Sequence, residues 1–200
     1  MTTTIHDQRI LSIASARGVL RARDLDCGAS RKALSRMAAS GLLEKVGWGL
    51  YGLSDRDVTE HEDLVTVAAK VPRAVFCLLT ALQFHDLTTH IPKQVWLAMP
   101  RGSHTPRMSW PPLKMIQTSD ELLKEGVEHV TSQGVGFRVY SPARTVVDCF
   151  KHRNKIGLDV ALEALRDARQ QRKVTSEELW HYAKLCRVSN VMRPYLEVVQ

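Results

Sequence analysis

The 200-residue sequence predicts an α+β protein with a small N-terminal domain and a larger, mixed α/β C-terminal domain that holds a small sheet and several helices. Three observations lead to this prediction. A short amphipathic helix and a hairpin follow one another between Val19 and Leu53. From about Thr59, strand-like runs alternate with longer helical ones, and helices alone follow Ser141. We therefore expect the two domains to span residues 1–58 and 59–200.

A helix predicted after Ser30 has one apolar side and one polar side. Ala33, Leu34 and Met37 fall on one face at helical spacing. Ser30 is placed to cap the helix, because its hydroxyl can accept a hydrogen bond from a backbone N–H of the first turn. The opposite face holds the polar side chains Arg31, Lys32, Ser35 and Arg36.

Tight turns are predicted on both sides of this helix. Ala22 and Leu25 indicate a shorter helix before it, and Cys27-Gly28 supplies the turn between the two, since glycine tolerates a positive φ. Gly41 stands where the second helix should end.

A hairpin follows. Residues 42–46 and 50–53 are predicted as strands around the turn Gly47-Trp48-Gly49. Two helices joined by a tight turn and followed by a hairpin make a winged helix-turn-helix, with the hairpin as the wing. Trp48 at the tip has two interpretations of equal weight: its ring packs back on its own strands, or it contacts a sugar or phosphate.

The cationic side of the second helix favours DNA binding, because a helix that docks on DNA needs positive charge facing the phosphates. The net charge of +7 also favours a polyanionic partner, nucleic acid first and acidic membranes second. The alternative is an ordinary solvated helix face. The residues that we expect to bind double-stranded DNA are Arg21, Arg23, Ser30, Arg31, Lys32, Ser35, Arg36, Lys45 and Trp48.

The C-terminal domain is predicted to combine strands and helices. Strands are expected at residues 94–99, 113–117, 127–131 and 137–140, the last two around a turn that holds Gly134 and Gly136. Helices are expected at residues 60–70, 77–85, 142–150, 158–170, 175–185 and 192–198. Ser141-Pro142 marks a helix start, and Thr175 with Glu178 forms a capping box.

Several function classes are disfavoured. No apolar run of about 18 residues could span a bilayer, and the N-terminus lacks the pattern of a signal peptide, so we expect a cytoplasmic protein. The four cysteines are widely spaced, which favours reduced, buried thiols. No HExxH, phosphate-binding Gly-rich loop or GxSxG motif is present, and His61 with Glu62 and Asp63 is only a weak metal candidate. We expect no metal, no cofactor and no catalytic residue.

Arg144, Thr145 and Asp148 form a group whose role has to be weighed. Arg144 and Asp148 are four residues apart on one helix, so they either pair with each other or bind an anion, and we favour the structural pair. Asp148 with His152 or His85 is a weaker candidate for acid–base chemistry. The candidate functional patch of this domain comprises Arg101 and Arg107, from a basic loop, with Arg144, Thr145 and Asp148.

Several motifs are shared with one known family. The N-terminal ones are GVLRARDL, GASRKALSRM, SGLLEKV and GWGLY, between Gly18 and Tyr51. The later ones are LTAL and HDL between Leu79 and Leu87, VWLAMP from Val95, and SPARTVVDC from Ser141. On these motifs the chain resembles the AbiEi-type antitoxins, the transcriptional-regulator half of type IV toxin–antitoxin systems, along nearly its whole length.

The resemblance implies an operon repressor that binds inverted repeats in its own promoter and opposes a nucleotidyltransferase-type toxin. By this resemblance, Arg31, Lys32, Ser35 and Arg36 would enter the major groove, while Lys45 and Trp48 approach the backbone. The C-terminal domain is associated with neutralising the toxin, in several members without a stable complex, so direct contact, toxin modification and action on the toxin's target all stay open. The alternative function is a C-terminal enzyme or RNA-binding module that acts on the toxin or its nucleic-acid target. We expect a monomer in solution.

Overall fold

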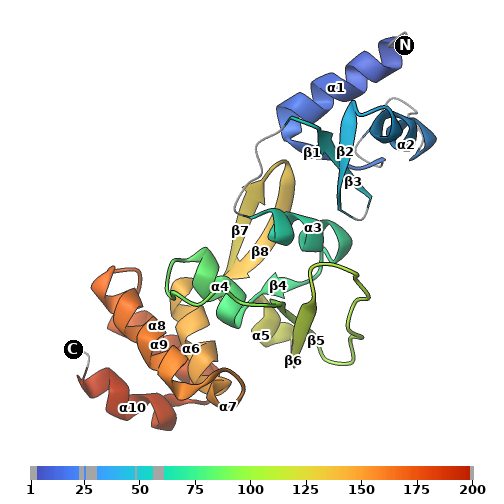
Figure 1. The fold of residues 1–200 in the computed structure, drawn as a ribbon. Helices are drawn as coiled ribbons and strands as arrows, with labels where there is room; N and C mark the ends of the chain where they lie inside the picture. The colour runs from blue at the N-terminus through green and yellow to red at the C-terminus, as the bar shows by residue number, and fades with distance from the viewer. Residues whose placement is uncertain (1–3, 23–24, 26–30, 48, 56–60, 199–200) are drawn as a thin grey trace. The chain divides into compact units, whose positions relative to one another are not determined.

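The computed structural model describes residues 4–22, 25, 31–47, 49–55 and 61–198 (Figure 1). The chain divides into two compact units. The first comprises Met1–Pro72 with Val130–Phe137, and the second comprises Arg73–His129 with Arg138–Gln200. The domain boundary predicted between residues 58 and 59 lies outside the described residues and stays a prediction.

In its described residues, the first unit combines helices with a small antiparallel sheet of order β1-β3-β2 (Figure 1). Its elements are α1 (Ile5–Arg17), β1 (Val19–Leu20), α2 (Arg31–Ala39), β2 (Leu43–Gly47), β3 (Leu50–Leu53) and α3 (Glu62–Lys70). The predicted helix after residue 30 and the predicted hairpin are both present. A hydrophobic core cluster of the unit is formed by Ile10, Ala14, Leu20, Leu25, Leu34, Met37 and Leu43.

Helix α1 was not expected from the sequence. It begins at a capping box: the Thr4 hydroxyl accepts a hydrogen bond from the Asp7 N–H at 3.2 Å, and the Asp7 carboxylate accepts one from the Thr4 N–H at 3.1 Å. The short helix predicted through Ala22 and Leu25, and the turn at Cys27-Gly28, lie mostly outside the described residues. The winged helix-turn-helix arrangement therefore stays a prediction.

Gly41 ends α2 as the sequence predicts. It adopts a φ of 76°, its N–H donates to the Ala38 carbonyl, and the Leu42 N–H reaches back to the Met37 carbonyl at 3.0 Å. These bonds satisfy carbonyls that the helix end would leave unpaired, and the left-handed backbone at the glycine makes them possible.

A five-stranded sheet of order β6-β5-β4-β8-β7 is the second sheet of the chain. Its strands are β4 (Val75–Phe76), β5 (Val95–Pro100), β6 (Leu113–Thr118), β7 (Val127–Ser132) and β8 (Val135–Tyr140). Strand β5 runs parallel to β6 and antiparallel to β4. The turn between β7 and β8 is shorter than predicted, because only Gln133 and Gly134 form it and Gly136 lies within β8. Both turn residues have a positive φ, as a two-residue hairpin turn requires.

Most helices of the second unit gather around α6, whereas α5 packs against β5 (Figure 1). They are α4 (Leu78–Phe84), α5 (Asp120–Lys124), α6 (Pro142–Lys151), α7 (Arg153–Ile156), α8 (Leu158–Gln170), α9 (Ser176–Leu185) and α10 (Ser189–Val198). The predicted caps are present, since Ser141 accepts from the Arg144 N–H, and Thr175 and Glu178 form a capping box. Helices and sheets are thus mixed, which confirms the α+β class. Within the described residues, no helix combines the length and the apolar character that a membrane span requires.

Candidate nucleic-acid interface

Helix α2 presents its polar side to solvent and its apolar side to the core of the first unit. Leu34 and Met37 are buried, with at most 1% of either residue exposed. Their burial fixes the rotation of the helix about its own axis. The side chains left exposed by that rotation are the predicted ones, Arg31, Lys32, Ser35 and Arg36.

The other predicted DNA-binding residues are placed less uniformly. Lys45 is exposed on β2, opposite Tyr51 of β3 in the sheet register, and Arg21 is half-buried after β1. Arg23, Ser30 and Trp48 lie outside the described residues. The predicted cap at Ser30, and both interpretations of Trp48, therefore stay predictions.

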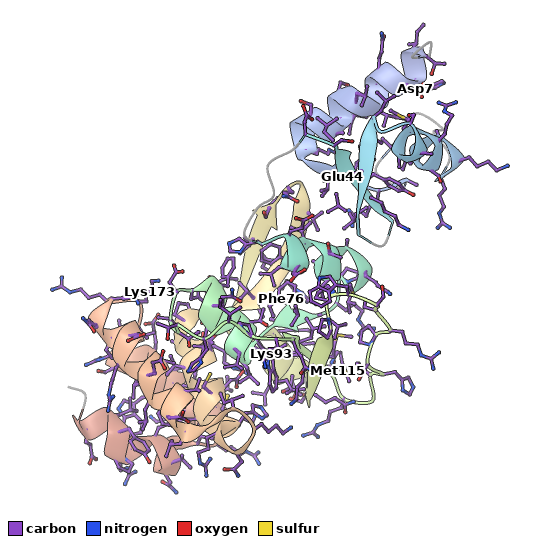
Figure 2. All side chains as sticks on the ribbon, in the orientation of Figure 1. Asp7, Glu44, Phe76, Lys93, Met115 and Lys173 are labelled. Carbon is purple, nitrogen blue, oxygen red and sulfur yellow. The ribbon has the colours of Figure 1, made fainter. Side chains whose placement is uncertain are left out.

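An ion pair joins α2 to α1. The Arg36 guanidinium donates from Nη2 to Oδ1 of Asp7 at 2.5 Å (Asp7 is labelled in Figure 2). The Asp7 side chain is 8% exposed, whereas 60% of the Arg36 side chain is exposed. The contact with Asp7 orients the Arg36 side chain. A guanidinium carries five N–H donors, so donors remain for another partner.

This pair changes the charge that α2 offers. Asp7 offsets much of the Arg36 charge locally, while within the described part of the chain neither Arg31 nor Lys32 forms an ion pair. Arg31 and Lys32 are therefore the stronger electrostatic attractors of a phosphate. Sequence reasoning missed Asp7, although Thr4 and Asp7 have the spacing of a capping box that marks a helix start.

The pKa of the Asp7 carboxyl is lowered. The largest cause is the hydrogen bond from the Thr4 backbone N–H, which outweighs the opposing effect of burial, and the Thr4 hydroxyl and Arg36 lower it further. A carboxyl whose folded-state pKa is depressed stabilises the folded chain above its ordinary pKa, and this contribution is lost as the pH falls through the lowered value.

We expect Asp7→Asn to remove this pH-dependent contribution. The variant should unfold at a lower urea concentration than the parent chain at about pH 7, and the difference should shrink at about pH 3, where the unfolded-state carboxyl is protonated. Urea unfolding at both pH values measures it. A difference that stays constant between them would show that the Asp7 charge contributes nothing to stability.

In the second unit, Arg144 and Asp148 form a buried pair on α6. Arg144 is 1% exposed and Asp148 is 2% exposed. The Arg144 Nε donates to Asp148 Oδ2 at 3.1 Å, its Nη1 donates to the Glu125 carbonyl at 3.3 Å, and its guanidinium lies 4.6 Å from the centre of the Tyr140 ring. The geometry favours the predicted structural pair over anion binding, because the guanidinium does not face solvent.

Further hydrogen bonds enclose this pair. The Tyr140 carbonyl accepts from Thr145 Oγ1 at 3.1 Å and from His85 Nε2 at 2.7 Å. Burial lowers the pKa of His85, and the bond to the Tyr140 carbonyl requires a proton on Nε2. The Cys186 thiol donates to Asp148 Oδ1 at 3.6 Å. Asp148 and His85 are thus both engaged in structural bonds, which counts against the acid–base alternative.

The predicted C-terminal patch does not form one surface. Arg101 and Arg107 are exposed on the loop between β5 and β6, whereas Arg144, Thr145 and Asp148 are buried. Among the described residues, no three His, Cys, Asp or Glu side chains come together as a metal site would require.

Comparison with known families finds a similarity to a transcriptional regulator over part of the first unit. Residues 8–54, which run from within α1 to just beyond β3, match the family model described as "Transcriptional regulator, AbiEi antitoxin". The match confirms the predicted resemblance for this part of the chain, and the motifs between Leu79 and Cys149 lie outside it. No curated protein matches the chain.

Proposed function

We propose that this protein is a DNA-binding autorepressor and the antitoxin of a type IV toxin–antitoxin system. It binds inverted repeats in its own promoter and counteracts a nucleotidyltransferase-type toxin in the cytoplasm. The observation that carries the proposal is the exposed cationic side of α2, in a segment that matches an AbiEi regulator family model. The apolar side of the same helix is fully engaged in the core, so the cations are held on a fixed support.

Arg31 and Lys32 supply the main phosphate contacts in this proposal. Both lie in the first turn of α2, where backbone N–H groups and the helix dipole also favour an anion. Ser35 and Arg36 lie one turn further along the exposed side. Arg36, directed by Asp7, is the residue best prepared to contact a base edge, because an oriented guanidinium can bond to guanine through two N–H groups.

Lys45 and the hairpin complete the contact with the DNA backbone, and two copies occupy the two halves of an inverted repeat. Half-sites about one helical turn apart, roughly 34–36 Å, would place both copies on the same side of the duplex. The chain is a monomer before it binds. We propose no catalytic role for Arg144 and Asp148, because both are buried and bonded to each other.

Salt-dependent binding to promoter DNA tests the proposal. Arg31→Ala/Lys32→Ala should weaken binding and lower the slope of log K against log salt concentration by about 1.8, since each lost phosphate contact removes about 0.9. The matched control is Arg166→Ala/Arg193→Ala, which removes two exposed arginines from α8 and α10 and changes the net charge equally. An unchanged slope in the α2 variant, or equal losses in both, would contradict the assignment of α2 as the DNA-binding helix.

A further inference from the structure

A long stretch of the second unit carries only positive charge. From Leu87 to Ser119 the sequence contains no Asp or Glu, although the whole chain holds 21 of them. The same stretch contains four lysines and arginines and two histidines, which are Lys93, Arg101, Arg107, Lys114, His90 and His104. Such a one-sided composition attracts polyanions without depending on α2.

The structure places most of these cations along one edge of the five-stranded sheet. The stretch comprises the segment before β5, which holds Lys93, then β5, the loop that follows it, and β6, which is the edge strand. We define the basic loop surface by its exposed side chains, which are Lys93, Arg101, His104, Arg107, Trp110 and Lys114. Side chains of the loop between β5 and β6 point away from the two strands in Figure 2, where the labelled Met115 lies in β6 and the labelled Lys93 precedes β5.

The loop is held at both ends. Near its start, the Arg101 N–H donates to the Thr118 carbonyl at 3.0 Å, and the Gln117 side chain donates to the Ser103 carbonyl at 2.8 Å. Near its end, the Val95 N–H donates to the Pro112 carbonyl at 2.9 Å. Strand β5 has six residues, so the loop runs along about 20 Å of the sheet edge. A loop backbone held in this way loses little conformational entropy when a ligand binds.

Trp110 is the second, independent observation. It is 68% exposed, although a tryptophan side chain is among the largest apolar groups and is usually covered. An exposed indole on the same loop as exposed cations provides a face on which a nucleic-acid base can stack. Bases in a duplex are already stacked on each other, so the exposed ring favours a single strand over a double strand.

We propose that the basic loop surface binds single-stranded nucleic acid, with phosphates along Lys93, Arg101 and Arg107 and a base stacked on Trp110. All of these residues belong to the second unit, so this interaction is separate from duplex recognition by α2. Either RNA or single-stranded DNA offers the required chemistry of phosphates and unpaired bases. The two are distinguished by measurement, because only RNA carries the 2′-hydroxyl.

The test is fluorescence anisotropy with the full chain and labelled oligouridylate and oligothymidylate of about 12 nucleotides. Trp110→Ala should weaken binding by at least about fivefold, and Trp110→Phe should retain most of it, because a phenyl ring also stacks on a base. Lys93→Ala/Arg101→Ala should lower the salt slope by about 1.4, at about 0.7 for each phosphate contact on a single strand. Tighter binding to oligouridylate than to oligothymidylate would assign the site to RNA, and equal binding would assign it to single strands of either kind.

Two control variants make the test specific. Arg166→Ala/Arg193→Ala removes the same charge elsewhere in the second unit and should bind both oligonucleotides as the parent chain does. Arg31→Ala/Lys32→Ala should lose promoter duplex binding and keep single-strand binding, which separates this proposal from the proposed function. The proposal is overturned if the parent chain binds neither oligonucleotide, if the loop variants lose no more than the control, or if the α2 variant abolishes single-strand binding. Binding to phosphatidylserine vesicles without binding to either oligonucleotide would also overturn it, in favour of a membrane surface.

Discussion

Asp148→Ala is expected to destabilise the protein by about 3–5 kcal/mol, the cost of leaving a buried charge without its partner. Arg144 would keep its bond to the Glu125 carbonyl and its contact with the Tyr140 ring, but it would lose the carboxylate 3.1 Å from its Nε. The Cys186 thiol would lose its acceptor as well. Urea unfolding of the full chain, followed by circular dichroism, measures the difference.

A paired substitution provides the control for Asp148. Arg144→Met/Asp148→Leu removes both charges and keeps side chains of similar volume, so it should recover most of the lost stability. A loss below about 1 kcal/mol for Asp148→Ala would contradict a structural pair, since it would imply that the Arg144 charge is solvated or otherwise compensated.

Leu34→Ala is expected to cost about 2–5 kcal/mol, the range for truncating a fully buried leucine. Leu34 is 0% exposed and belongs to a small apolar cluster. Few other apolar contacts therefore remain to hold the helix when the Leu34 side chain is truncated. Because the same helix carries Arg31 and Lys32, duplex binding should fall with stability even though no cation is removed. Urea unfolding and promoter binding of the same preparation test both effects.

The adjacent residue supplies a matched control. Ser35→Ala changes an exposed side chain on the same helix and should alter stability by no more than about 0.5 kcal/mol. If Leu34→Ala left both stability and DNA binding unchanged, the apolar face of α2 would not be what holds its cations in place.

The elements that the sequence predicts best are those with local signals. Helix α8 follows its apolar periodicity with the predicted bounds, and α6 and α9 begin at the caps marked by Ser141 and Thr175. Strand β4 was missed because it has two residues, Val75 and Phe76, and exists only through pairing with β5 and β8. Helix α1 was missed because its apolar spacing is weak, and its capping box was the available signal.

In the candidate site, too, features within one helix could be predicted from the sequence, whereas contacts between residues far apart in the sequence could not. The exposed face of α2 follows from helical spacing alone, as does the alignment of Arg144 with Asp148. The link between Asp7 and Arg36 could not be predicted, because the two residues are 29 positions apart and meet only once the helices pack. Nor does spacing reveal that the carbonyls of Glu125 and Tyr140 complete the surroundings of Arg144 and Thr145.

The two oxygens of the Asp7 carboxylate accept hydrogen bonds from two different helices. Oδ2 accepts from the Thr4 N–H at the first turn of α1, and Oδ1 accepts from Arg36 on α2. Fraying of that first turn would release the carboxylate and, with it, the ion-pair partner of Arg36 on the proposed DNA-binding helix. Under the proposed function, a deletion that removes Thr4 would thus weaken operator binding without removing a contact residue, so protein for binding studies is better tagged at its other end.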